Sequence, residues 1–166
     1  MSATPSDEPR AIAVIDIDGV LADVRHRLGH LDKRPKDWRS FFREAIKDPP
    51  LAEGLDAAHR LAEVYEVVYL SGRPEHLRKD TEAWFRRHGL PAGELHLRPR
   101  NDFRPARDFK VAMLRRFRDR APVAVLVDDD ALVLDAARAA GFDVLPATWM
   151  GEAPSLLEAQ EVDGET

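Results

Sequence analysis

Two aspartates close an apolar run near the start of the chain, in the sequence Asp16-Ile17-Asp18-Gly19-Val20. The run 11–15 predicts a strand, and acids spaced i and i+2 on a strand project to the same side of a sheet. Two unit charges about 4 Å apart repel by roughly 4 kcal/mol at an effective dielectric constant near 20. The pair therefore predicts a cation, a proton or a substrate beside its carboxylates. An ordinary strand exit is the alternative, whereas an EF-hand calcium loop would need a glutamate where this chain has Arg27.

Three further signals follow along the chain. Ser71-Gly72-Arg73-Pro74 comes directly after the apolar run 67–70. A hydroxyl, a turn glycine and a guanidinium at this place suit phosphate oxygens, although the same residues would equally form a helix cap. Lys110 lies in a charged helical segment, and Asp128-Asp129-Asp130 follows the apolar run 123–127. A helix cap accounts for one of these acids but not for three, so the cluster predicts chemistry.

Composition narrows the class of protein. The chain has 166 residues, of which 44% are hydrophobic and 33% charged, as in one globular domain with its own core. It contains no cysteine, which excludes disulfides, thiolate catalysis and cysteine-bound zinc and leaves oxygen atoms as the natural metal ligands. No run approaches the roughly 20 apolar residues of a transmembrane helix, and residues 1–10 are polar with two prolines. We therefore expect a soluble, cytoplasmic protein.

Apolar runs alternate with amphipathic segments along the chain. Strands are predicted at 11–17, 65–71, 94–98, 123–128 and 142–146, and helices at 37–47, 54–63, 75–88, 108–119 and 131–140. This alternation is typical of an α/β fold with a central parallel sheet that is covered on both faces. Ligands of such sheets bind beyond the carboxyl ends of the strands, where Asp16, Ser71 and Asp128 are expected to lie.

The order of these signals, D-x-D-G-V, then S-G-R, then lysine, then D-D, resembles the four motifs of the haloacid dehalogenase (HAD) superfamily of phosphotransferases. A narrower likeness, to the 3′-phosphatase domain of polynucleotide kinase, rests on segments 16–27, 71–73 and 84–88, the arginine-rich approach to Lys110 and the pair 128–129. The resemblance implies a three-layer Rossmann-like HAD fold. It also implies hydrolysis of phosphomonoesters through an aspartyl phosphate.

The resemblance also bears on the lid of the site. HAD enzymes for small metabolites often carry a large cap domain, whereas only about 45 residues separate Val20 from the second predicted strand. We expect a minimal cap, a small flap within 21–60, in a single phosphatase domain at 11–160. Disorder is expected at 1–10 and 161–166. The site should therefore be open, which suits a phosphate on a bulky molecule.

Roles for the matching residues are implied by the same resemblance. Asp16 would be the nucleophile, and Asp18 would be the general acid and base, which requires a raised pKa. Ser71 and Lys110 would hold the phosphate oxygens. Mg²⁺, or Mn²⁺ as its substitute, would bind Asp16, the backbone carbonyl of Asp18, Asp128 and Asp129.

Substrate contacts are implied for two arginines. Arg27 and Arg73 resemble basic residues that contact the substrate in polynucleotide phosphatases, and Asp108 would orient one of them. Ala106 stands where an acid is expected from the family pattern. This departure concerns Asp108 and the nucleic-acid substrate, and not the core chemistry.

Basic residues are concentrated in two segments, although the net charge is −5. Eight lysines or arginines accompany three acids in 24–47, and nine accompany four in 94–120, so each segment carries +5. Such segments would steer an anionic polymer, and Arg98, Arg100 and Arg104 lie in a predicted loop of the second one. The alternative is that these segments are solvated helix faces.

Three functions fit these observations. The first is removal of 3′-phosphates from DNA or RNA ends, the second is hydrolysis of a nucleotide or another small phosphomonoester, and the third is phosphate binding without turnover. A receiver domain fits poorly, because its phospho-accepting aspartate follows the acidic pair on a later strand. No GxxxxGK[ST] motif is present, so kinase activity would need another polypeptide. No membrane partner is expected, and the sequence leaves the oligomeric state open.

Overall fold

A sheet of five parallel strands forms the centre of the computed structural model, which describes residues 8–166. The strands are β1 (Ile12–Ile15), β2 (Glu66–Pro74), β3 (Glu94–Arg98), β4 (Val123–Asp128) and β5 (Val144–Pro146). All five lie at the predicted places, and the predicted α/β fold with a central parallel sheet is confirmed. The sheet order β3-β2-β1-β4-β5 changes direction between β1 and β4. In parallel sheets this switch opens a crevice at the carboxyl ends of the strands, where ligands bind.

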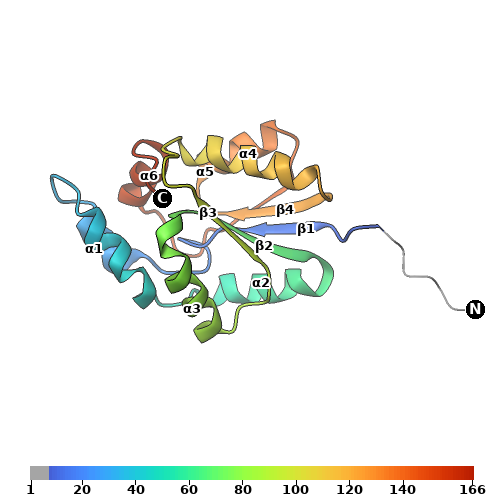
Figure 1. Ribbon diagram of the computed structural model, residues 1–166, viewed down its shortest axis with the longest axis horizontal. Helices are drawn as coiled ribbons and strands as arrows, with labels where there is room; N and C mark the ends of the chain where they lie inside the picture. The colour runs from blue at the N-terminus through green and yellow to red at the C-terminus, as the bar shows by residue number, and fades with distance from the viewer. Residues whose placement is uncertain (1–7) are drawn as a thin grey trace, which may run out of the picture.

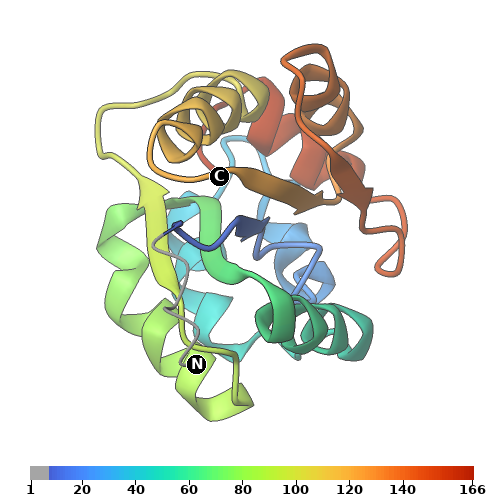
Figure 2. The ribbon, with the colours of Figure 1, turned by 90° about the vertical axis from the view of Figure 1, so that its right-hand side faces the viewer.

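Two pairs of helices cover the two faces of the sheet. The helices α4 (Ala106–Arg118) and α5 (Ala131–Ala139) lie on one face, and α2 (Ala52–Val64) and α3 (Arg78–His88) lie on the other (Figure 1). A 3-10 turn, η3 (Glu75–Leu77), precedes α3. Figure 2 shows the resulting three layers from the end of the molecule at which β1 begins.

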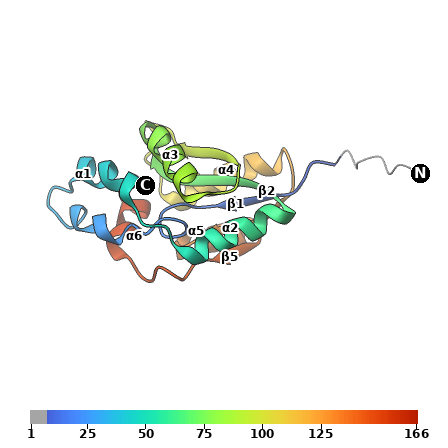
Figure 3. The ribbon, with the colours of Figure 1, turned by 90° about the horizontal axis from the view of Figure 1, so that it is seen from below.

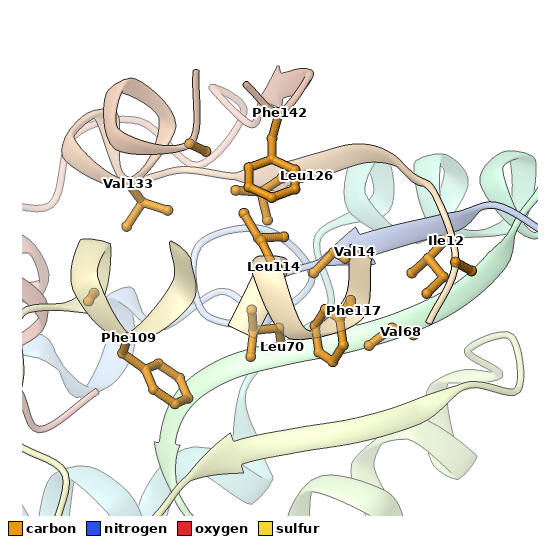
Figure 4. Packing of buried hydrophobic residues seen from close by; sticks show 13 residues of the cluster. Ile12, Val14, Val68, Leu70, Phe109, Leu114, Phe117, Leu126, Val133 and Phe142 are labelled. Carbon is orange, nitrogen blue, oxygen red and sulfur yellow. The ribbon is translucent and has the colours of Figure 1, made fainter. Parts of the chain in front are cut away.

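The strands pack apolar side chains on both faces, because successive residues point to opposite sides. Val14 and Leu70 project toward Leu114 of α4 in one buried cluster (Figure 4). Ile15 and Tyr69, one residue away along the same strands, belong to the cluster on the other face. Burial on both faces fixes the sheet, and thereby the positions of the loops that follow its strands.

Residues 21–51, which we call the flap, lie at the carboxyl ends of the strands as short helical turns. They are η1 (Arg25–His30), α1 (Trp38–Arg43) and η2 (Glu44–Lys47), whereas the sequence predicted one helix at 37–47. A further helix that was not predicted, α6 (Pro154–Glu161), packs beside them through a third apolar cluster that contains Phe41 and Leu156 (Figure 3). Proline at the first helical position is the sequence signal that could have identified α6. The flap is therefore anchored by a core of its own.

The segment 161–166, for which the sequence predicts disorder, packs at the carboxyl edge of the sheet. Lys36 forms an ion pair with Asp163, 127 positions away along the chain. The backbone of Gly164 approaches Phe103 so closely that a Cβ would stand 2.0 Å from the Phe103 carbonyl oxygen. Contacts between such distant residues leave no trace in local composition, on which the prediction of disorder for 161–166 rests.

Two other expectations concern the start of the chain and membranes. Residues 1–7, the larger part of the other segment predicted to be disordered, lie outside the described residues. Within residues 8–166, no helix has the length and apolar character needed to cross a membrane.

Candidate active site

The loop after β1 presents Asp16 and Asp18 at the carboxyl edge of the sheet. The Asp16 N–H donates to the Val127 carbonyl at 3.0 Å, which keeps this loop paired with β4. Gly19 then turns with a φ of 81°, and a Cβ here would stand 2.2 Å from Asp129 Oδ2. Glycine alone permits both the turn and the approach. The D-x-D-G sequence thus brings the acids after β1 against those after β4.

Three carboxylates form an acidic cluster, in which Asp16, Asp128 and Asp129 each offer an oxygen within 4.8 Å of the other two. Lys110 Nζ lies 2.9 Å from Asp16 Oδ2 and 2.6 Å from Asp128 Oδ2. Among the described residues, Asp129 Oδ1 is buried without a hydrogen-bond partner. One ammonium group balances one of the three carboxylates, so a net charge of two minus remains when all are ionised. A divalent cation would balance it.

Burial shifts the pKa values within the acidic cluster. It raises the pKa of Asp16 to about 7 against the opposing charge of Lys110, and the Asp128 charge adds to the rise. Burial also raises the pKa of Asp128 and raises that of Asp129 well above its usual range. For Lys110, burial disfavours the ammonium form, but Asp128 and Asp16 outweigh this effect and raise the pKa. Because the pKa values of these carboxyl groups are raised, protons compete with a metal ion for their oxygens. An all-oxygen donor set fits Mg²⁺ or Mn²⁺.

We expect Mg²⁺ to stabilise the protein against heat, by an amount that grows from about pH 5 to about pH 8. Protons compete with the ion for Asp16, whose pKa is raised to about 7, so binding strengthens as this carboxyl ionises. Calorimetry with and without Mg²⁺ measures the gain in Tm. Asp129→Asn should remove most of the gain, whereas Asp135→Asn, on an exposed side chain of α5, should leave it unchanged. A gain that is equal at both pH values would contradict the expectation.

Asp18 lies outside the acidic cluster and is held by two arginines. Arg73 donates to Asp18 Oδ1 from Nε at 2.8 Å and from Nη2 at 2.6 Å, and Arg27 Nη2 donates to the same oxygen at 3.1 Å. Burial raises the pKa of this carboxyl, but the charges of Arg73 and Arg27 outweigh burial and lower it to about 2. The raised pKa expected from the sequence is therefore wrong for the protein without substrate, because guanidinium groups favour the carboxylate form.

Asp48, at the end of η2 in the flap, was not predicted from the sequence. Its buried carboxylate accepts from Arg27 Nε and Nη2 at 2.8 Å each and from Arg73 Nη2 at 2.9 Å, and it lies 2.7 Å from His26 Nε2. Asp48 thus fixes both arginines in the orientation in which they bind Asp18, and we call Arg27, Arg73 and Asp48 the arginine clamp. A single acid in a charged segment carries no sequence signal that would have marked it.

Ser71 and Asp108, the remaining predicted site residues, differ in their contacts with the two arginines. Ser71 is buried in β2, where its Oγ accepts the Arg73 N–H at 3.1 Å. Asp108 is exposed in the first turn of α4 and, among the described residues, has no hydrogen bond or ion pair with Arg27 or Arg73. Ala106 is fully buried. The acid that orients the arginines therefore comes from the flap and not from α4.

Only some of the arginines in the predicted basic segment 94–120 are available to a substrate. Arg98 is 2% exposed and donates to the Arg104 carbonyl at 2.9 Å, so it holds its loop together and is not available to a substrate. Arg115 and Arg116 lie in the last turn of α4. This turn lies at the amino ends of the strands, which is the end of the sheet opposite to the site. Of the loop arginines, Arg100 and Arg104 remain exposed.

Thr166 brings the segment 161–166 onto the Asp18 carboxylate. Its hydroxyl donates to Asp18 Oδ2 at 3.3 Å, and the residue is 3% exposed. Gly72 leaves the space for it, since a Cβ at Gly72 would stand 2.1 Å from the Thr166 carbonyl carbon. Asp18 therefore receives the arginines on Oδ1 and a hydroxyl on Oδ2.

Comparisons with known proteins agree with this geometry. The family model described as the polynucleotide kinase PNKP phosphatase domain, of HAD type, matches residues 9–148. A protein of the Pnkp1/Rnl/Hen1 complex is 22% identical over 87% of this chain and 48% of its own, with a TM-score of 0.69. A haloacid dehalogenase-like hydrolase from Streptococcus pneumoniae is 13% identical over 92% of each chain, with a TM-score of 0.60. An L-2-haloacid dehalogenase is 17% identical over 87% of this chain and 88% of its own, with a TM-score of 0.53.

This chain spans about half the length of the Pnkp1 complex protein that it matches, since 48% of that protein is covered. No curated protein sequence matches it.

Proposed function

This chain belongs to the family of polynucleotide kinase phosphatase domains within the HAD superfamily, and we propose that it removes 3′-phosphates from nucleic-acid ends. The observation that carries the proposal is that Asp16 and Asp18 have different surroundings at the carboxyl edge of the sheet. Asp16 lies in an acidic cluster that suits a divalent cation, while Asp18 lies in a separate clamp of arginines. A nucleophile and a proton-transfer group need such different surroundings.

The reaction would begin with attack of the Asp16 carboxylate on phosphorus. The bond from phosphorus to the 3′-oxygen breaks as the aspartyl phosphate forms, and the leaving oxygen takes a proton from Asp18. Water then attacks the aspartyl phosphate, gives its proton to Asp18 and releases inorganic phosphate. Ser71 and Lys110 would hold the phosphoryl oxygens throughout. Mg²⁺ in the acidic cluster would supply charge neutralisation for the transferring group.

The arginine clamp explains how Asp18 can serve as an acid despite its low pKa. Without substrate, Arg73 and Arg27 keep the pKa of Asp18 at about 2. A phosphate dianion near the same guanidinium groups offsets their positive charge, and this raises the pKa of Asp18. Arrival of the phosphomonoester would thereby allow the carboxyl to hold the proton that the leaving oxygen needs.

Two observations support a nucleic-acid substrate. The matched family is that of a polynucleotide phosphatase domain, and the similar solved protein comes from a complex described as an RNA repair complex. Arg100 is exposed in the loop after β3 and lines the same groove as Pro74, the residue after Arg73 of the clamp, and Arg104 is exposed in the same loop, where it pairs with Asp102. Exposed arginines near the site suit the phosphodiester backbone of the strand whose 3′ end would enter it.

The proposal predicts that a 3′-phosphorylated oligonucleotide outcompetes a nucleoside 3′-monophosphate, with an advantage that falls as salt rises. Arg100→Gln combined with Arg104→Gln should raise the oligonucleotide KM and reduce the slope of log(kcat/KM) against log salt by about one per arginine. Arg115→Gln with Arg116→Gln is the matched control, because it removes the same charge at the end of the sheet opposite to the site. Steady-state phosphate release at several salt concentrations measures both.

A small phosphomonoester is the second candidate substrate. It is favoured by the observation that Arg27, Arg73 and Arg98 are engaged in bonds within the protein and are buried. Equal kcat/KM for oligonucleotide and mononucleotide at low salt, unaffected by the double arginine variant, would decide for this candidate and against a polymer.

A further inference from the structure

A groove opens beside the clamp, and the proposed chemistry makes no use of it. It encloses about 770 Å³, and its lining includes Phe42, Pro74, His76, Arg100, Phe103 and Glu165. Small-molecule sites commonly fall within about 300–1,000 Å³, so the volume admits a group of nucleotide size.

The lining of the groove combines aromatic faces with charged groups. Phe103 is 59% exposed although it is a large apolar residue, and the Phe42 and His76 rings meet edge to face with centroids 5.9 Å apart. Arg100 adds a cation, and Glu165 adds an acceptor for amino groups. Exposed rings with a nearby arginine and a hydrogen-bond acceptor match a nucleobase, which has a π face and polar edges. A purely apolar ligand would leave the charged groups without partners.

Two residues that line the groove, Pro74 and Glu165, are chain neighbours of residues that contact Asp18. Pro74 directly follows Arg73, and Glu165 directly precedes Thr166, and both of these neighbours contact the Asp18 carboxylate. The Thr166 hydroxyl at 3.3 Å from Oδ2 is itself an alcohol bound to this acid. In a phosphomonoester the leaving group is also an alcohol oxygen, and the rest of its molecule must extend away from Asp18. The groove offers such a direction.

We infer that this groove binds the base of the terminal nucleotide, the one whose 3′-oxygen leaves, by stacking it on Phe103. The inference rests on the proposed function and deepens it, since it makes the terminal base a recognition element. The sugar oxygen would take over from Thr166 the contact with Asp18, so the end of the segment 161–166 must shift as the nucleotide enters.

The test removes the base from the substrate and the ring from the protein. The substrates are a nucleoside 3′-monophosphate and its abasic counterpart, each free and at the end of the same oligonucleotide. Phe103→Leu should raise KM about tenfold for the base-bearing forms, in line with the usual effect of one base–aromatic stack, and should leave the abasic forms unchanged. Phe103→Tyr should keep the wild-type KM, because it retains the ring. Val64→Ala, at an equally exposed apolar residue of α2, should have no effect.

The outcomes separate this inference from the proposed function. Equal effects of Phe103→Leu on base-bearing and abasic substrates, or none on either, would overturn the inference. A base effect in the mononucleotides without any advantage of the oligonucleotide would uphold the groove and overturn the polymer substrate. An oligonucleotide advantage without a base effect would overturn the groove as the site of the base and uphold the polymer substrate.

Discussion

Asp16→Asn should reduce phosphate release by at least about 10³-fold, because an amide cannot form the aspartyl phosphate that divides the displacement into two steps. The protein should remain folded. Burial raises the pKa of Asp16 to about 7, which means that the native state disfavours this carboxylate's charge, and an amide carries none. Lys110 keeps its partner Asp128 at 2.6 Å. Single-turnover phosphate release and the Tm of the purified variant are the two measurements.

Asp135→Asn makes the same chemical change on an exposed part of α5 and should keep wild-type activity. Activity of Asp16→Asn above a few per cent of wild type, in a variant with an unchanged Tm, would exclude Asp16 as the nucleophile.

The strands and their acidic ends could be predicted because their signals are local. Apolar runs mark β1, β2 and β4, and the residues with chemistry follow them directly, as Asp16 and Asp128 do. In a parallel sheet, topology then brings all carboxyl ends to one edge. The acidic cluster with Lys110 is therefore assembled by the fold from three separate segments, of which the two acidic ones are recognisable by themselves and Lys110 only by its place in the series.

The arginine clamp and the segment 161–166 could not be predicted because their contacts join distant residues. Asp48 lies 21 positions from Arg27 and 25 from Arg73, in a flap whose loops have no fixed period. Thr166 lies 148 positions from Asp18. The sign of the pKa shift at Asp18 depends on these partners, since burial alone would raise it. Spacing therefore marked Asp18 as a candidate, whereas the raised pKa that its implied role requires is opposite in direction to the shift that these partners cause.

The second large effect is expected for Asp48→Asn, which should lower kcat about 10²-fold for a nucleoside 3′-phosphate, the lower end of the usual contribution of general acid catalysis. Two carboxylates now share the charges of Arg27 and Arg73. With Asp48 neutral, both guanidinium groups act on Asp18 alone, which lowers its pKa further and holds it as the carboxylate. A leaving alkoxide then lacks its proton donor.

The choice of leaving group distinguishes this effect from simple damage to the fold. p-Nitrophenolate departs without a proton, so kcat for p-nitrophenyl phosphate should fall less than about threefold in Asp48→Asn. Asp37→Ala removes the N-cap of α1 and so weakens the flap without touching either arginine, and it should affect both substrates alike. An equal loss on both substrates in a folded Asp48→Asn protein would mean that the clamp maintains the flap and does not govern the proton on Asp18.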